Sequence, residues 1–281
     1  MKKNWVYAYL KYIEKKVNTL AEKEDKVCFV FFRTWFLAGL LKYGFATLLK
    51  HQYPNCKIVF YIQDQVSVSG IPIELLKDNS DLVIYYDKKD ALKYDGLYYN
   101  VPYSAIDEFK VPSNKISSDV YFVGYAKDRY WDIIEAYEKL SSEGLICDFN
   151  IMGVPKENRL YEDDINYENV LSYEENLKKA GKARCILEII QKGSQGNTLR
   201  TYEAIMLDKI LLSNNQDLKE SDLYDARYMQ IYTDIREVDI DKIQMQKNVQ
   251  YRDKDRLYPE KFLDFIEQIL KRENYNFNGT N

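Results

Sequence analysis

A strand that turns through glycines into a helix is the clearest structural signal in this sequence. The apolar run Cys185–Ile190 predicts a buried strand, and the apolar spacing over Leu199–Leu207 predicts a helix. The loop between them, residues 191–198, holds Gly193 and Gly196. Glycine lets backbone N–H groups converge, and a helix N-terminus carries a partial charge of about +0.5. The stretch therefore predicts an α/β fold with an anion site at this loop.

Three side chains beside this loop have the chemistry that a nucleotide requires. Thr198 can cap the helix or donate to a phosphate oxygen, and Arg200 adds a forked cation on the first turn. Glu203 lies about one turn further, where a carboxylate can accept hydrogen bonds from a ribose diol. An ordinary polar cap explains the same residues without a ligand, because glycine-rich βα turns are common. On these residues alone both interpretations stay open.

The spacing of the loop and helix also resembles a known signature. Gln195-Gly196 followed by Glu203-Ala204 has the layout of the E-G-(six residues)-E-A signature of GT-B glycosyltransferases, with Gln195 in place of the first acid. The resemblance extends over residues 118–214 of the 281. Three stretches are similar to a bacterial group that assembles capsule and lipopolysaccharide sugars: Ser172–Leu177, Arg184–Ile189 and Gly196–Ala204.

The resemblance implies both a fold and an activity. The fold would be α/β, with two Rossmann-like lobes (GT-B-like) and a C-terminal helix crossing back to the first lobe. The activity would be metal-independent glycosyl transfer of the hexosyltransferase type, without a cofactor. The donor would be a nucleotide-sugar, expected to be UDP-linked, and the acceptor a saccharide or a lipid-linked saccharide. Such a transferase would work in bacterial surface polysaccharide biosynthesis.

Site residues follow from the resemblance together with the chemistry of diphosphate release. Lys127 and Arg129 would neutralise the leaving diphosphate, and they are the catalytic candidates together with Asp64, which would contact the acceptor or act as base. Tyr173 would stack on the nucleotide base. The expected donor-binding residues are Tyr125, Lys127, Arg129, Tyr173, Gln195, Gly196, Asn197, Thr198, Arg200 and Glu203.

Other functions find less support in the sequence. A non-catalytic nucleotide- or glycan-binding protein on the same fold is the alternative, and a short first lobe is consistent with it. The only histidine is His51, which excludes serine and cysteine triads with histidine. The D-x-D pairs at Asp239–Asp241 and Asp253–Asp255 lack a clear preceding strand, so we predict no metal site. Glu188, inside an apolar strand, is either a buried, paired carboxylate or a ligand.

Strands alternating with helices predict parallel sheets in two lobes. The expected strands are residues 27–32, 57–62, 82–86, 96–101, 119–124, 147–152, 185–190 and 210–213. One helix is expected over Trp35–Leu49. Apolar periodicity lapses between Pro102 and Ser118, so we predict an acceptor-side lobe at 1–110 and a nucleotide-sugar-binding lobe at 118–256. A helix over 257–272 would pack back on the first lobe.

The charges differ between the two lobes. Residues 1–117 carry 17 Lys and Arg against 13 Asp and Glu, whereas residues 118–281 carry 23 against 31, and the net charge of −4 argues against a nucleic-acid binder. The first 20 residues predict a lysine-rich helix, which is either a surface helix with one buried face or a basic helix resting on anionic lipid. No apolar run reaches the ~20 residues that span a bilayer. We therefore expect a cytoplasmic protein, peripheral to the inner face of the plasma membrane in the second case.

Overall fold

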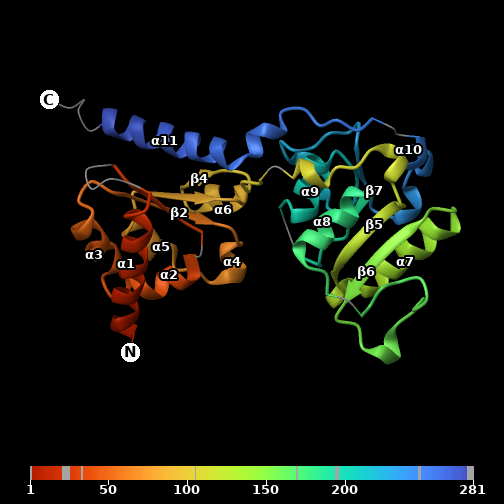
Figure 1. Ribbon diagram of the computed structural model, residues 1–281, viewed down its shortest axis with the longest axis horizontal. Helices are drawn as coiled ribbons and strands as arrows, with labels where there is room; N and C mark the ends of the chain where they lie inside the picture. Colours follow the sequence, from red (N-terminus) through yellow and green to blue (C-terminus); the bar gives the residue numbers. More distant parts are fainter. Residues whose placement is uncertain are drawn as a thin grey trace. The chain divides into compact units, whose positions relative to one another are not determined.

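The computed structural model describes residues 2–20, 26–32, 34–104, 106–168, 170–193, 196–245 and 248–276. The chain forms two compact units, Met1–Val101 and Pro102–Asn281. Each unit is built on one parallel sheet with helices between its strands (Figure 1). The predicted fold class, α/β with two Rossmann-like lobes, is confirmed.

The first unit holds a four-stranded parallel sheet whose strands pair in chain order. They are β1 (Cys28–Phe31), β2 (Lys57–Ile62), β3 (Leu82–Tyr85) and β4 (Leu97–Tyr98). The helices are α1 (Lys2–Val17), α2 (Thr34–Leu41), α3 (Phe45–Gln52), α4 (Val66–Ser69), α5 (Ile73–Lys77) and α6 (Lys88–Lys93). Every residue of β3 is buried, as expected for a strand whose sequence is an unbroken apolar run.

The single helix predicted over Trp35–Leu49 is wrong, because the chain forms two shorter helices there. α2 ends at Leu41 and α3 begins at Phe45. Between them Gly44 has a φ angle of 77°, a left-handed conformation that interrupts a helix and that glycine adopts without strain. The apolar spacing continues across this break, which is why the sequence pattern suggests one helix.

The second unit holds a five-stranded parallel sheet in the order β6-β5-β7-β8-β9. The strands are β5 (Ser118–Tyr125), β6 (Cys147–Met152), β7 (Ala183–Glu188), β8 (Ile210–Ser213) and β9 (Met229–Ile231). The helices are α7 (Tyr130–Ser142), α8 (Tyr173–Gly181), α9 (Leu199–Leu207), α10 (Ile240–Met245) and α11 (Pro259–Asn276), and η1 (Asp107–Phe109) and η3 (Lys127–Arg129) are 3₁₀ turns. β6 and β7 lie on opposite sides of β5, so the strand order reverses there.

Two further elements bear on the sequence predictions. β9 was not predicted, because its three residues are too few to show a periodic pattern. α11 carries Phe262, Ile266 and Leu270 on one buried stripe, and its return to the first lobe stays a prediction.

Within the described part of the chain, no helix combines the length and the apolar character that crossing a bilayer requires.

Gly181 should not tolerate a side chain. It ends α8 against η1, and a Cβ there would lie 1.9 Å from the carbonyl oxygen of Phe109. Because backbone must shift to relieve this overlap, we expect Gly181→Ala to lower the free energy of unfolding by about 1–3 kcal/mol in urea denaturation. Gly39→Ala is the control, since a Cβ on Gly39 would meet nothing within 4 Å. An equally stable Gly181→Ala variant would show that this contact is misplaced.

Candidate functional site

The candidate site lies where the strand order of the second unit reverses. In open parallel sheets, ligands bind beyond the carboxyl ends of the strands at this switch point. Here the point lies between β5 and β7, which pair directly. Two segments begin at their carboxyl ends: residues 126–129 after β5, and residues 189–198 after β7. These are the segments in which the sequence predicted diphosphate-binding residues.

Arg129 joins the two segments. Its Nε and Nη2 groups donate to the carbonyl oxygen of Tyr125 at 3.3 and 3.1 Å, and its Nη1 donates to that of Ile189. The guanidinium lies 5.9 Å from the ring centroid of Phe122. A Cβ on Gly124 would come within 2.9 Å of Nη2, so glycine at this position makes room for the guanidinium. The arrangement fixes a forked cation across the carboxyl ends of β5 and β7.

The charge of Arg129 is not neutralised by a carboxylate. No acidic side chain of the described residues lies within ion-pairing distance of it. Burial lowers the pKa of Arg129, Asp128 opposes this effect, and the nearby charge of Arg200 adds to it. An arginine remains protonated despite such a shift. The result is a half-buried, charged group that an anionic ligand would stabilise.

Two other candidates at the carboxyl end of β5, Lys127 and Tyr125, are exposed. Lys127 opens η3 with a φ angle of 46°, and its ammonium group has no hydrogen-bond partner among the described residues. The side chain of Tyr125 is also exposed, at the end of β5 beside Gly153. Both side chains are therefore accessible to a ligand at this edge of the sheet.

Glu188 anchors the start of α9. It ends β7 and is 1% exposed, and its carboxylate accepts hydrogen bonds from the hydroxyl groups of Thr198, Thr201 and Ser213. Of these, Thr198 is the N-cap of α9, Thr201 lies in its first turn, and Ser213 ends β8. Glu188 is thus buried and hydrogen-bonded to three hydroxyl groups, and a ligand role for it stays a hypothesis.

The loop before α9 is shaped by its glycines and by hydrogen bonds to its backbone. Gly193 and Gly196 have φ angles of 79° and 78°, which are left-handed conformations. The side chain of Asn215 donates to the carbonyl oxygen of Gly196 at 2.8 Å, and that of Asn197 donates to Ser221 at 3.1 Å. The loop is therefore tied to the segment that follows β8. Gln195 lies outside the described residues.

Thr198 caps α9, as the sequence predicted. Its hydroxyl oxygen accepts a hydrogen bond from the backbone N–H of Arg200 at 3.1 Å while its hydroxyl hydrogen points to Glu188. Donation to a phosphate would require this hydroxyl to leave Glu188. In the observed arrangement Thr198 stabilises the N-terminus of α9 as its N-cap.

Arg200 and Glu203 belong to a buried polar network. Glu203 is 0% exposed and accepts hydrogen bonds from Arg200 and, at 3.1 Å, from the side-chain amide of Asn176. The amide oxygen of Asn176 accepts from Arg200 at 3.0 Å and from the Tyr121 hydroxyl at 2.9 Å. Burial raises the pKa of Glu203, and Arg200 and Asn176 oppose this effect. The network orients Arg200, whose side chain stays 22% exposed.

The sequence missed the central member of this network. Asn176 lies between Glu175 and Leu177 on α8, and it is buried although its neighbours gave no sign of a polar cluster. A polar amide on the buried face of an amphipathic helix was the available signal.

Tyr173 and Asp64 lie in different surroundings. Tyr173 begins α8 and is exposed, and its hydroxyl contacts that of Tyr103, whose ring stacks on Tyr202 with centroids 6.1 Å apart. Burial of its inner part raises the pKa of Tyr173. Asp64 belongs to the first unit, is exposed and follows β2. Its contact with an acceptor stays a prediction.

Neither a protein-family model nor a curated protein matches the sequence. Solved structures do match. A structure described as the Glycosylation Associate Protein (Gap123) complex from Streptococcus agalactiae has a TM-score of 0.51 at 12% identity, covering 96% of this chain and 55% of that chain. UDP-GlcNAc 2-epimerase from Methanocaldococcus jannaschii has a TM-score of 0.51 at 16% identity, covering 95% of this chain and 82% of that chain.

These matches concern the fold. The chain has the GT-B-like fold that its sequence resembles. It spans about half the length of the Streptococcus agalactiae chain.

Proposed function

We propose that this protein is an enzyme that transfers a sugar from a nucleoside-diphosphate donor to a saccharide or lipid-linked acceptor. The observation that carries the proposal is Arg129, a half-buried cation without a carboxylate partner at the switch point of the second sheet. The N-terminus of α9 begins at the same edge. A leaving diphosphate needs such fixed positive charge, because negative charge grows on it as the sugar departs.

Each remaining residue has a role in this proposal. Lys127 and Arg129 bind the diphosphate, together with the backbone amides of Gly196 and Asn197. Arg200 reaches the same phosphates from the first turn of α9, held by Glu203 and Asn176. Direct contact of Glu203 with a ribose requires Arg200 to move aside, because the carboxylate is fully buried. The exposed ring of Tyr173 is available for stacking on a base, which we propose to be uracil, and the exposed side chain of Tyr125 completes the donor site among the described residues.

A non-catalytic nucleotide-binding or glycan-binding protein is the second candidate. Glu188 and Glu203, which come just before and just after the loop in sequence, are buried and engaged in hydrogen bonds, so neither is placed to act as a base. In the proposed enzyme the base comes from elsewhere, and Asp64 is the candidate. The name of one structural neighbour, a glycosylation-associated protein complex, is compatible with either function.

A transfer assay separates these two candidates. Nucleotide-sugars that bind the protein would be incubated with lipid-linked saccharides from bacterial membranes, and release of nucleoside diphosphate and labelling of the acceptor would be measured. We expect acceptor-dependent release, which Asp64→Asn reduces if Asp64 is the base. Binding without turnover on every acceptor would support the non-catalytic protein, and isomerisation of the sugar with the nucleotide still attached in the product would indicate an epimerase. Acceptors from surface polysaccharide pathways test the proposed biological role.

Donor binding should survive removal of divalent metal ions. The reason is that Arg129, Lys127 and the N-terminus of α9 supply fixed positive charge at the proposed diphosphate site. We expect the dissociation constant for a nucleoside diphosphate to change less than twofold in EDTA, measured by calorimetry. Loss of binding in EDTA that manganese restores would contradict the prediction.

We propose that α1 contacts an anionic membrane at the inner face of the plasma membrane. Its face with Val6, Leu10 and Ile13 is buried, whereas Trp5 and Tyr12 are exposed, 61% and 55%. The same helix carries exposed lysines at positions 11, 15 and 16. Exposed aromatic rings next to lysines match the headgroup region of a bilayer with anionic lipid.

Sedimentation with liposomes tests this contact. We expect binding to anionic liposomes that fades between low and physiological salt, because a Debye length of about 8 Å screens the attraction. Trp5→Ala should weaken it further, and Trp131→Ala, which removes an exposed tryptophan of the second unit, should not. Equal binding to neutral and anionic liposomes, or none to either, would rule the contact out.

A further inference from the structure

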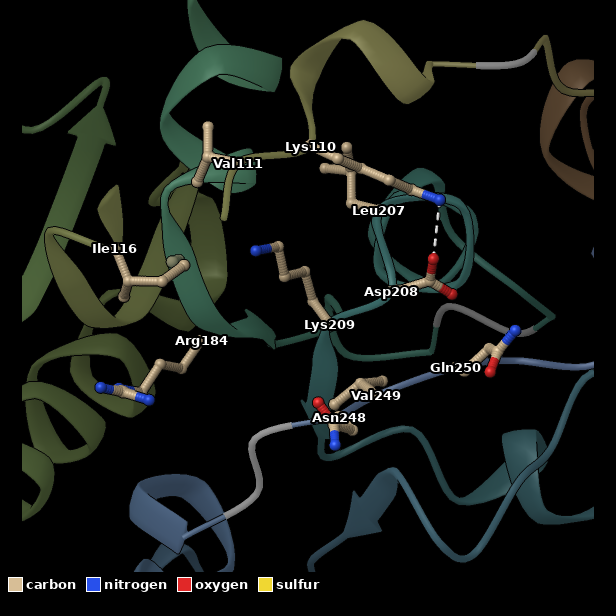
Figure 2. Close-up of a pocket in the computed structure, with 11 residues that line it drawn as sticks. Lys110, Val111, Ile116, Arg184, Leu207, Asp208, Lys209, Asn248, Val249 and Gln250 are labelled. Carbon is tan, nitrogen blue, oxygen red and sulfur yellow. Dashed lines mark hydrogen bonds and ion pairs between the residues drawn. The ribbon is translucent and has the colours of Figure 1, made fainter. Parts of the chain in front are cut away.

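A second pocket lies at the opposite edge of the second sheet from the candidate donor site. It has a volume of about 540 Å³. Its lining includes Ala183 and Arg184, the first residues of β7, and Lys209, which directly precedes β8 (Figure 2). Parallel strands have their amino ends at one edge and their carboxyl ends at the other. The pocket is therefore separated from Arg129 and Thr198 by the length of the strands.

Lys209 is the unusual member of this lining. It is 6% exposed, and its ammonium group donates one hydrogen bond, to the carbonyl oxygen of Gly181 at 2.7 Å. Among the described residues it has no carboxylate within ion-pairing distance and no second hydrogen bond. An ammonium group has three hydrogens to donate, and burying its charge without a counter-ion is costly. Figure 2 shows its side chain extending among the lining residues.

The surrounding charges do not neutralise Lys209. Asp208 is the nearest acid in sequence, but one of its oxygens pairs with both Lys110 and Lys254 at 2.6 Å, as Figure 2 shows for Lys110. Arg184 pairs through Nε with Asp119. Burial lowers the pKa of Lys209 to about 8, Asp208 opposes this effect, and Lys110 and Arg184 add to it. At neutral pH the amine is therefore still mostly protonated, in a region of excess positive charge.

The other residues that line the pocket have aliphatic or amide side chains. Four aliphatic side chains and two amides complete it: Val111, Ile116, Leu207, Val249, Asn248 and Gln250. A volume of this size accommodates a small organic molecule. The aliphatic wall suits an apolar body, and the amides can donate hydrogen bonds to an anionic group.

We propose that this pocket binds a small molecule that carries a phosphate or carboxylate group on an apolar body, with the anionic group paired to Lys209. The anion supplies the counter-charge and the hydrogen-bond acceptors that the ammonium group lacks, while the body covers the aliphatic wall. This site does not depend on the donor site. α9 begins at the candidate donor site and ends at Leu207, which lines this pocket, so each site can be tested by its own variants.

Calorimetry with two probes tests the proposal. Phenyl phosphate and benzoate share an apolar ring and differ in the anionic group, so the tighter of the two identifies the preferred group. We expect at least one to bind the parent protein, more tightly than inorganic phosphate does. Lys209→Met should weaken this binding roughly 10- to 100-fold. Lys156→Met, at an exposed lysine, should leave it within twofold of the parent.

Arg129→Met distinguishes the two sites. Because Arg129 belongs to the donor site, this variant should leave binding of the preferred probe unchanged. Failure of both probes to bind the parent protein would overturn the proposal. So would binding that Arg129→Met abolishes and Lys209→Met retains, because the probe would then occupy the donor site.

Chemical footprinting of lysines in the parent protein tests the same binding without the need for a folded variant. Acetic anhydride at pH 8 acetylates lysine amines. Mass spectrometry measures the acetylated fraction of Lys209 and compares it with that of Lys156. The preferred probe should slow acetylation of Lys209 at least fivefold and leave Lys156 unaffected. Sodium chloride of matched ionic strength should protect neither. Equal rates at Lys209 with and without the probe would show that the anion binds elsewhere.

Discussion

Arg129→Met should lower the affinity of the protein for a nucleoside diphosphate by roughly 10- to 100-fold. Methionine keeps the length of the stem but removes the charge and the fork that spans the ends of β5 and β7. Losing a hydrogen bond to a charged group typically costs about 1.5–3 kcal/mol, which corresponds to this range. Calorimetry with the diphosphate and with the phosphate-free nucleoside should show the loss for the diphosphate alone.

Two variants make this result specific. Arg129→Lys keeps the charge but lacks the rigid planar fork that donates to Tyr125 and Ile189, so its affinity should lie between those of the parent and Arg129→Met. Arg236→Met removes an exposed arginine that pairs with Asp234, and it should bind like the parent. An unchanged affinity in Arg129→Met would mean that the phosphates bind elsewhere.

Glu188→Ala should lower the free energy of unfolding by about 2–4 kcal/mol. The buried carboxylate accepts hydrogen bonds from three hydroxyl groups. Each hydroxyl group left without an acceptor costs about 1–3 kcal/mol, but water that enters the space can accept some of these hydrogen bonds and reduce the total cost. Because Thr198 and Thr201 lose their anchor, the first turn of α9 should loosen and nucleoside diphosphate binding should fall as well. Urea denaturation and calorimetry measure the two effects.

Two control variants separate the hydrogen-bonding role of Glu188 from the effect of removing a carboxylate charge. Glu188→Gln keeps one acceptor oxygen and the shape of the side chain, so it should cost less than Glu188→Ala. Glu168→Ala removes an exposed carboxylate and should change stability by less than about 0.5 kcal/mol. If Glu188→Ala is as stable as the parent, the hydroxyl groups find other acceptors and Glu188 is not the anchor.

Buried strands were the most predictable part of the fold. The runs at 57–62, 147–152 and 210–213 became β2, β6 and β8 with the predicted limits. β2 and β8 are almost entirely buried and almost entirely apolar, as expected for inner parallel strands. The break at Gly44 was not predictable from periodicity, since a left-handed residue can interrupt a helix without disturbing the apolar spacing. Local pattern therefore located the strands better than it located the end of α2.

The residues of the candidate site could also be predicted only in part from the sequence. Residue types identified Arg129, Thr198 and Arg200, because cations and caps next to a glycine loop suit a phosphate. The partners of these residues could not be predicted. Arg129 bonds to a carbonyl 60 residues away, and Arg200 meets Asn176 only because α8 and α9 are neighbours. Such contacts depend on tertiary structure, which one sequence without its fold does not reveal.

Binding of a nucleoside diphosphate at the switch point of the second sheet can be measured with a thermal-shift panel of UDP, GDP, CDP and ADP, with their sugars. The panel is run on the parent, Arg129→Met and Arg236→Met proteins. We expect at least one diphosphate, UDP above all, to raise the melting temperature of the parent and of Arg236→Met, and we expect Arg129→Met to lose most of this shift. No shift with any nucleotide, or a shift that Arg129→Met retains in full, would contradict this expectation.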